Sequence, residues 1–182
     1  MIKNTEASYG WLAIVLHWGM ALGVFFLFGL GLYMVELSYY DAWYKGALDL
    51  HKSVGVLLLF SWLLRLVWRI SNIQPKAEIT GRRFENYEHK AAHFAHILLY
   101  ILMISLMTSG YLISTADGRA IDVFGLFEVP ALPALVDKQE DVAGMVHFYL
   151  AWSLIALVVI HALGALKHHF IDKDKTLLKM IK

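Results

Sequence analysis

The chain has 182 residues, of which 59% are hydrophobic and only 17% are charged, and its formal net charge at pH 7 is +1. Soluble domains carry about 25% charged residues, so this composition favours a membrane protein over a soluble domain. Cysteine is absent, which excludes disulfides, thiolate metal sites, iron–sulfur clusters and covalently attached c-type haem.

Four apolar segments are each long enough to cross a bilayer. Three of them contain no Asp, Glu, Lys or Arg: residues 7–35, 91–116 and 142–166. The remaining segment, residues 48–70, keeps its charges toward its ends, where long side chains can reach the interface. About 20 residues span the ~30 Å hydrocarbon core. We therefore predict a single domain, residues 1–182, with transmembrane helices at about 8–36, 48–70, 91–115 and 142–168.

The basic residues are unevenly shared between the two sides that these helices define. Eleven lie with the two termini and the loop of residues 71–90: Lys3, Arg69, Lys76, Arg82, Arg83, Lys90, Lys167, Lys173, Lys175, Lys179 and Lys182. Four lie on the other side: Lys45, Lys52, Arg119 and Lys138. Cytoplasmic loops of membrane proteins carry the excess of Lys and Arg, so we expect both termini in the cytoplasm.

Four histidines occupy matching depths in the predicted helices. His17 and His161 lie near the cytoplasmic ends of the first and fourth helices, and His51 and His147 lie near the outer ends of the second and fourth. Fourteen residues between His147 and His161 correspond to roughly 21 Å along a helix, with the two side chains within ~40° of one another around it. A buried polar group without a partner costs a few kcal/mol. The two histidines at each depth therefore need a ligand or a hydrogen-bond partner.

Two imidazoles from facing helices at each depth form a ligand set for a haem iron. We therefore predict two bis-histidine haems, one held by His17 and His161 and the other by His51 and His147, as an electron path across the membrane. Gly55, one turn after His51, would leave room for a macrocycle. A single membrane histidine more often serves proton relay, substrate contact or packing, and a single glycine can serve close helix packing. Four histidines that pair by depth favour haem.

Seven motifs, in order along the chain, carry a family resemblance. They are LHW at 16–18, LHKSVG at 50–55, LRLVWRI at 64–70, AAHFAHILLYILM at 91–103, VHFYLAW at 146–152, IHALGALKHHF at 160–170 and DKTLLKMI at 174–181. Together they resemble the bacterial cytochrome b561 family, four-helix membrane cytochromes with two b haems. The resemblance covers residues 10–181. It implies haem ligation by the same four histidines and electron transfer with membrane quinone at the bacterial inner membrane.

Several polar residues near the haem depths are candidate contacts for haem or quinone. Arg65 lies fourteen residues after His51, at the inner depth, and a cation within a membrane helix usually faces a partner in the bundle interior. Haem propionates or a quinone headgroup would serve, and we expect quinone exchange near Arg65 and His168. Lys52 is a candidate partner for a propionate of the outer haem. Arg69, one turn on, could contact the same groups or anchor a lipid phosphate. Snorkelling to the interface is the alternative for all three cations, and for Arg69 we favour it.

Three further histidines, His89, His93 and His96, share one face at the start of the third helix. We interpret them as an interfacial patch, with metal binding as the alternative. His93 is the rival of His17 as a ligand of the inner haem. The longest outer segment, residues 115–141, has an apolar stretch that could lie on the membrane surface, cover the outer haem edge or dock an electron donor.

The predicted fold is therefore an all-α integral membrane four-helix bundle with bis-histidine haems. Its predicted function is one-electron transfer from a periplasmic donor to membrane quinone, and no nucleic-acid partner is expected. Some members of the resembled family oxidise superoxide. Electrostatic attraction of this anion is favoured by basic residues around its point of entry. The outer loops are acidic instead, with nine carboxylates: Glu36, Asp41, Asp49, Asp117, Asp122, Glu128, Asp137, Glu140 and Asp141. The alternatives are a cytochrome b anchor subunit of a membrane hydrogenase or dehydrogenase complex, and a haem-free transporter or channel.

Overall fold

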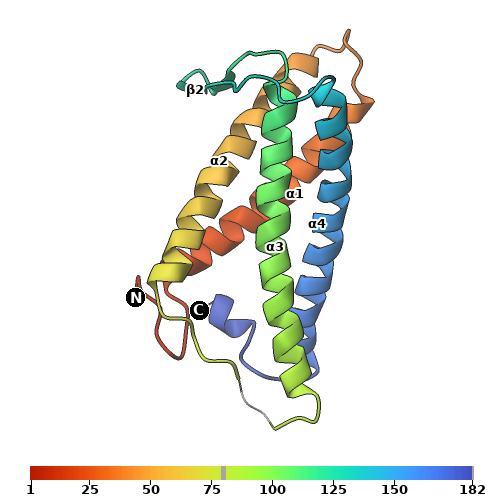
Figure 1. Ribbon diagram of the computed structural model, residues 1–182. Helices are drawn as coiled ribbons and strands as arrows, with labels where there is room; N and C mark the ends of the chain where they lie inside the picture. The colour runs from red at the N-terminus through yellow and green to blue at the C-terminus, as the bar shows by residue number, and fades with distance from the viewer. Residues whose placement is uncertain (79–80, 182) are drawn as a thin grey trace. The chain divides into compact units, whose positions relative to one another are not determined.

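The computed structural model describes residues 1–78 and 81–181 (Figure 1). Its main elements are four long helices: α1 (Trp11–Glu36), α2 (Tyr44–Ser71), α3 (Glu85–Ser114) and α4 (Gln139–Phe170). Two short strands, β1 (Ile121–Val123) and β2 (Phe127–Val129), lie between α3 and α4, and a 3₁₀ helix, η1 (Leu178–Met180), follows α4. Each long helix has the length and hydropathy of a membrane span. The prediction of an all-α protein with four transmembrane helices is confirmed.

The chain forms two compact units, and each contains parts of all four helices. The terminal unit comprises Met1–Trp18, Leu63–Met103 and Trp152–Lys182, and so includes both chain ends. The hairpin unit comprises Gly19–Trp62 and Ile104–Ala151, and includes the two strands. Because the division runs across the helices and not along the chain, one domain over residues 1–182 remains a prediction.

Three of the helices begin well before the apolar limits that were used to predict them. Helix α3 begins at Glu85 and carries Glu88 in its first turn, and α4 carries Glu140 and Asp141 there. Carboxylates interact favourably with the partial positive charge of a helix N-terminus. These helices therefore extend past the bilayer-spanning run into polar sequence, and α2 likewise begins at Tyr44.

Helix α1 begins at Trp11, later than predicted, because the preceding segment is folded against its start. The N–H of Gly10 donates to the side-chain oxygen of Asn4 at 2.9 Å, and the side-chain amide of Asn4 donates to the carbonyl of Ile73, also at 2.9 Å. A Cβ atom on Gly10 would lie 2.0 Å from the carbonyl oxygen of Ile2. Only glycine fits this close backbone approach.

The segment between α3 and α4 contains a β-hairpin that the sequence patterns did not predict. Strands β1 and β2 pair antiparallel, and Phe124 and Gly125 both have positive φ, at 54° and 69°. The N–H of Leu126 donates to the carbonyl of Val123 at 3.0 Å, which makes this the primed type of turn that suits a twisted hairpin. The hydroxyl of Ser53 on α2 accepts from the N–H of Phe124 at 3.2 Å, which ties the hairpin to α2.

Many large apolar side chains on the four helices are exposed. Leu22 of α1 is 69% exposed, Val67 of α2 is 61% exposed and Ile160 of α4 is 63% exposed. Backbone groups in these helices are satisfied within the helix, as a bilayer demands. The exposed apolar surface therefore suits contact with lipid tails.

Candidate functional site

The terminal unit brings three histidines from three helices together. The rings of His17 on α1 and His161 on α4 have centroids 6.3 Å apart and planes inclined by 67°. The ring of His96 on α3 lies edge-on to His161, with centroids 5.1 Å apart. His93, which the sequence predicts as the rival ligand, is exposed. The residue that accompanies the His17–His161 pair is thus His96.

The hairpin unit holds the other predicted pair in the same geometry. The rings of His51 on α2 and His147 on α4 have centroids 6.3 Å apart and planes inclined by 67°. Nδ1–H of His147 donates to the carbonyl of Leu106 at 3.1 Å, and the Ser109 hydroxyl lies 3.1 Å from the same nitrogen. A hydrogen bond at Nδ1 fixes the ring orientation and leaves Nε2 available to a metal.

Both pairs have the spacing that two imidazoles on one iron require. A metal–imidazole nitrogen bond is about 2.0–2.1 Å, and the ring centre lies ~1.1 Å beyond the nitrogen, so two rings on opposite sides of one iron have centroids roughly 6.3 Å apart. The pairs His17–His161 and His51–His147 match this value. The 5.1 Å between His96 and His161 is too short for it. The donor sets therefore fit one bis-histidine haem in each unit.

Glycines on neighbouring helices make room for the rings of the hairpin unit. A Cβ on Gly110 of α3 would lie 3.1 Å from Cε1 of His147, and a Cβ on Gly31 of α1 would lie 3.6 Å from Cε1 of His51. Next to Gly55 nothing lies within 4 Å of the Cβ position, so a macrocycle would not be obstructed there. Sequence reasoning missed Gly110 because its partner is remote in sequence and only the packing of α3 on α4 reveals it.

Nδ1 of His51 and Nε1 of Trp68 are buried polar atoms without a hydrogen-bond partner in the part of the chain that the structure describes. Buried polar groups are nearly always satisfied in native proteins, so each points to a ligand that supplies the partner. His51 lies in the hairpin unit and Trp68 in the terminal unit.

The two cations that the sequence predicts as haem or quinone contacts, Lys52 and Arg65, have different partners in the structure. Lys52 forms an ion pair with Asp49, with 3.1 Å between Nζ and Oδ1, so the predicted propionate partner already has a carboxylate of its own. Arg65 lies in the terminal unit, close enough to His17 and His161 to interact with their rings electrostatically. Its Nε–H donates to the hydroxyl of Tyr100 at 3.1 Å.

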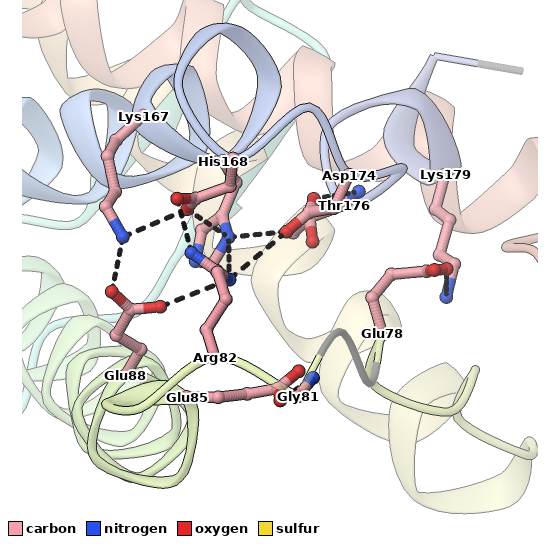
Figure 2. Close-up of polar contacts among 11 residues, drawn as sticks. Glu78, Gly81, Arg82, Glu85, Glu88, Lys167, His168, Asp174, Thr176 and Lys179 are labelled. Carbon is pink, nitrogen blue, oxygen red and sulfur yellow. Dashed lines mark hydrogen bonds and ion pairs between the residues drawn. The ribbon is translucent and has the colours of Figure 1, made fainter.

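His168 lies in a charge cluster where α4 ends (Figure 2). We define the charge cluster by its six residues: Arg82, Glu88, Lys167, His168, Asp172 and Asp174. Nδ1 of His168 is 2.7 Å from a carboxylate oxygen of Asp174 and 3.2 Å from one of Asp172. Two carboxylates of the tail that follows α4 therefore engage Nδ1 of His168. The expected contact of His168 with quinone stays a prediction.

The cations of the charge cluster hold its carboxylates in the ionised form. Burial alone would raise the pKa of Asp172, but hydrogen bonds from Lys167 and Arg82 outweigh it and keep that pKa below its ordinary value. Burial likewise opposes the lowered pKa of Asp174, to which Thr176 and His168 donate hydrogen bonds. The same carboxylates raise the pKa of Arg82 against the effect of its burial.

Three members of the charge cluster have the spacing of metal ligands. The donor atoms of Glu88, His168 and Asp172 lie within 4.8 Å of one another. Lys167 pairs with both Glu88 and Asp172, and Arg82 bonds to the same two carboxylates. Because these side chains already supply the compensating positive charge, the charge cluster is an ionic clasp between α3, α4 and the tail.

Comparisons with known proteins place these histidine pairs in context. The family model described as prokaryotic cytochrome b561 matches residues 8–182. Cytochrome b561 homolog 2 of Escherichia coli (strain K12) is 47% identical over 178 residues, which cover 98% of this chain and 93% of that protein. The probable superoxide oxidase CybB of Yersinia pestis is 30% identical over 185 residues, with 96% of each chain covered. Cytochrome b561 homolog 1 of Escherichia coli (strain K12) is 34% identical over 97 residues, about half of each chain. The two longer matches extend over all four helices.

Proposed function

We propose that this chain, which belongs to the prokaryotic cytochrome b561 family, carries single electrons across a bacterial inner membrane between two haem b groups. Membership in this family makes the chain a multi-pass membrane cytochrome, and the family implies b-type haem. The number of haems rests on one observation, the two histidine pairs with the same 6.3 Å spacing and 67° inclination. We infer one haem at each pair.

The side chains around each pair have distinct tasks. When bound, a haem b at each site supplies an iron that alternates between the ferric and ferrous states. His17 and His161 would hold one iron, and His51 and His147 the other. The Leu106 carbonyl that accepts from His147 makes this imidazole a more basic ligand and stabilises its orientation.

We infer that the donor lies at the outer face and that membrane quinone is the acceptor at the terminal unit. The family relationship supports a redox partner of this kind. His96, half-buried and edge-on to His161, can donate a hydrogen bond to a quinone carbonyl there. His168 is less suited to this task, since its Nδ1 is engaged by Asp174.

Superoxide is one candidate donor, because a relative is named a probable superoxide oxidase. The outer loops nevertheless offer it little positive charge. Of the four basic residues predicted at that face, Lys52 is paired with Asp49, and Arg119 donates to Asp117 at 2.7 Å. An anion gains little from cations that are already neutralised. We therefore favour a neutral or protein donor over superoxide.

The haem content of the purified protein tests this proposal. A pyridine haemochrome assay and a protein assay on one sample should give two b haems per chain, extractable because no cysteine can tether them. A ratio near one would contradict the two-site proposal, and a colourless protein would contradict haem binding altogether. Hydrophilic subunits that copurify stoichiometrically would favour the alternative, an anchor subunit of a hydrogenase or dehydrogenase complex.

A further inference from the structure

Two arginines in the membrane-spanning part of the terminal unit have no anionic partner among the described residues. Arg65 and Arg69 are one turn apart on α2 and so share a face of that helix. Both are half-buried, and neither forms an ion pair with a carboxylate of residues 1–78 or 81–181. By contrast, Arg82 and Arg119 outside the membrane are each paired with aspartate.

Both guanidinium groups are directed to the same residue of α3. Arg65 donates its Nε–H to the Tyr100 hydroxyl at 3.1 Å, and Cζ of Arg69 lies 5.7 Å from the centroid of the Tyr100 ring. Arg69 therefore faces α3, which favours a partner in the bundle over a lipid phosphate. Tyr100 is neutral, so these contacts orient the two cations without balancing their charge.

Charge balance favours an anion with more than one acceptor as the partner of these two arginines. Ionised side chains within a membrane are expensive unless they are paired, and two adjacent cations need two negative charges. Nε1 of Trp68, between the two arginines in sequence, is a further buried donor without an acceptor in the described chain. Guanidinium groups match carboxylates in geometry as well as in charge.

We propose that Arg65 and Arg69 bind the two propionate carboxylates of the haem held by His17 and His161, and that Tyr100 is a positioning residue for Arg65. This inference rests on the proposed function, since it requires a haem at that pair. Arg65 is close enough to both histidines to interact with their rings electrostatically. A neutral quinone headgroup at the same place would leave two positive charges uncompensated.

The consequence of this arrangement is a shift in the reduction potential of one haem. A cation beside the haem favours the ferrous state, which carries one positive charge less than the ferric state. Removal of either guanidinium charge should therefore lower the equilibrium constant for reduction of the terminal-unit haem about tenfold, which is ~59 mV for a one-electron couple. The haem of the hairpin unit should keep its potential.

Redox titration of detergent-purified protein, followed by haem absorption, tests the inference. Arg65→Gln and Arg69→Gln should each lower the potential of the haem that His17→Ala removes, while Arg65→Lys keeps it near the wild-type value. Tyr100→Phe should shift it in the same direction by a smaller amount. Arg83→Gln is the matched control: Arg83 is an exposed arginine of the same unit, outside the helices, and both potentials should stay unchanged.

Each other outcome counts against the inference. Unchanged potentials in both glutamine variants, with two haems bound, would overturn it. Slower quinone reduction at unchanged potentials would overturn it too, and would place the arginines in the quinone site. If Arg65→Gln loses the haem, Arg65→Lys decides, because retention with a near-normal potential supports propionate binding and loss contradicts it. Failure of the proposed function is recognised separately, by wild-type protein that lacks two haems.

Discussion

At the scale of single residues, each histidine pair is set by helix position and by the neighbours that leave it room. His17 and His161 lie in one unit and His51 and His147 in the other, with equal spacing within each pair. If each pair holds a haem, removal of one imidazole leaves its iron with a single protein ligand and weakens the retention of that haem.

Four alanine substitutions should therefore fall into two groups. His17→Ala and His161→Ala are expected to remove one haem, and His51→Ala and His147→Ala the other, each lowering the content from two haems to about one per chain. Haem content and the absorption bands that disappear provide the measurement. His96→Ala is the control and should retain two haems. Loss of a haem in His96→Ala but not in His17→Ala would reassign the α1 ligand.

A methyl group at Gly110 should disturb only the haem site of the hairpin unit. Its Cβ would lie 3.1 Å from Cε1 and 3.4 Å from Nδ1 of His147, so the ring must move and its hydrogen bond to Leu106 must weaken. We expect Gly110→Ala to change the spectrum and potential of that haem alone. Gly46→Ala is the matched control, since its new Cβ would meet only the ring of Trp43, at 3.6 Å. An unchanged spectrum in Gly110→Ala would contradict this role.

The two histidine pairs could be predicted from the sequence, but their surroundings could not. Depth follows from counting residues along apolar helices, so His51 could be matched to His147 without coordinates. The place of His96 beside His161 depends on how α3 is rotated, and three histidines on one helical face leave this open. The direction in which Arg69 faces was open for the same reason, because only its position over the Tyr100 ring shows it.

At the scale of elements, the apolar runs predicted that four helices exist but not where they end. Carboxylates in the first turns of α3 and α4 extend these helices into sequence that looks polar. The β-hairpin escaped prediction because Phe124, a bulky residue, adopts positive φ next to Gly125, and such residues are outliers there. The tail after α4 contacts α1 through a hydrogen bond: Nε1–H of Trp18 donates to the carbonyl of Met180 at 2.7 Å.

The charge cluster should hold this tail in place, and Arg82→Gln should release it. Arg82 bonds to Glu88, Asp172 and Asp174, so its loss leaves buried carboxylates with fewer partners. We expect amide hydrogen exchange in residues 171–181 to become several-fold faster at neutral pH, while exchange within the four helices is unchanged. Arg83→Gln is the control. Equal exchange in wild type and Arg82→Gln would show that the tail is held by other contacts.

Acid should release the tail only at low pH. The pKa values of Asp172 and Asp174 are held below the ordinary 3.8 of aspartate. A carboxylate whose pKa is lower in the folded state stabilises that state at pH values above its unfolded pKa, and this contribution is lost as pH falls through the folded value. The protection of the amides in residues 171–181, measured relative to their intrinsic exchange rate at each pH, should thus be insensitive to these two aspartates from neutral pH down to about pH 4 and fall below it. A loss of protection already between pH 7 and pH 5 would contradict control by these two aspartates.

At the scale of the whole molecule, the distribution of basic residues predicts the orientation in the membrane. The absence of native cysteine makes this prediction direct to test. Ala77→Cys and Ala120→Cys each introduce one thiol at an exposed position outside the helices. A membrane-impermeant thiol reagent should label Ala120→Cys in spheroplasts and Ala77→Cys only after the membrane is opened. The reverse pattern would place the termini outside.

The side chain of Asn4 imposes an order in time on the maturation of the chain. Its bond to the Ile73 carbonyl joins positions 69 residues apart, so the acceptor does not exist until the ribosome has completed α2. During synthesis, residues 1–10 can make their local bonds to the start of α1 early, as Gly10 does with Asn4. Their bond to residue 73 can form only after the first helical hairpin has been completed. Protection of this segment from proteases would thus report on completed insertion of two helices, and nascent chains arrested before residue 73 should remain susceptible to cleavage there.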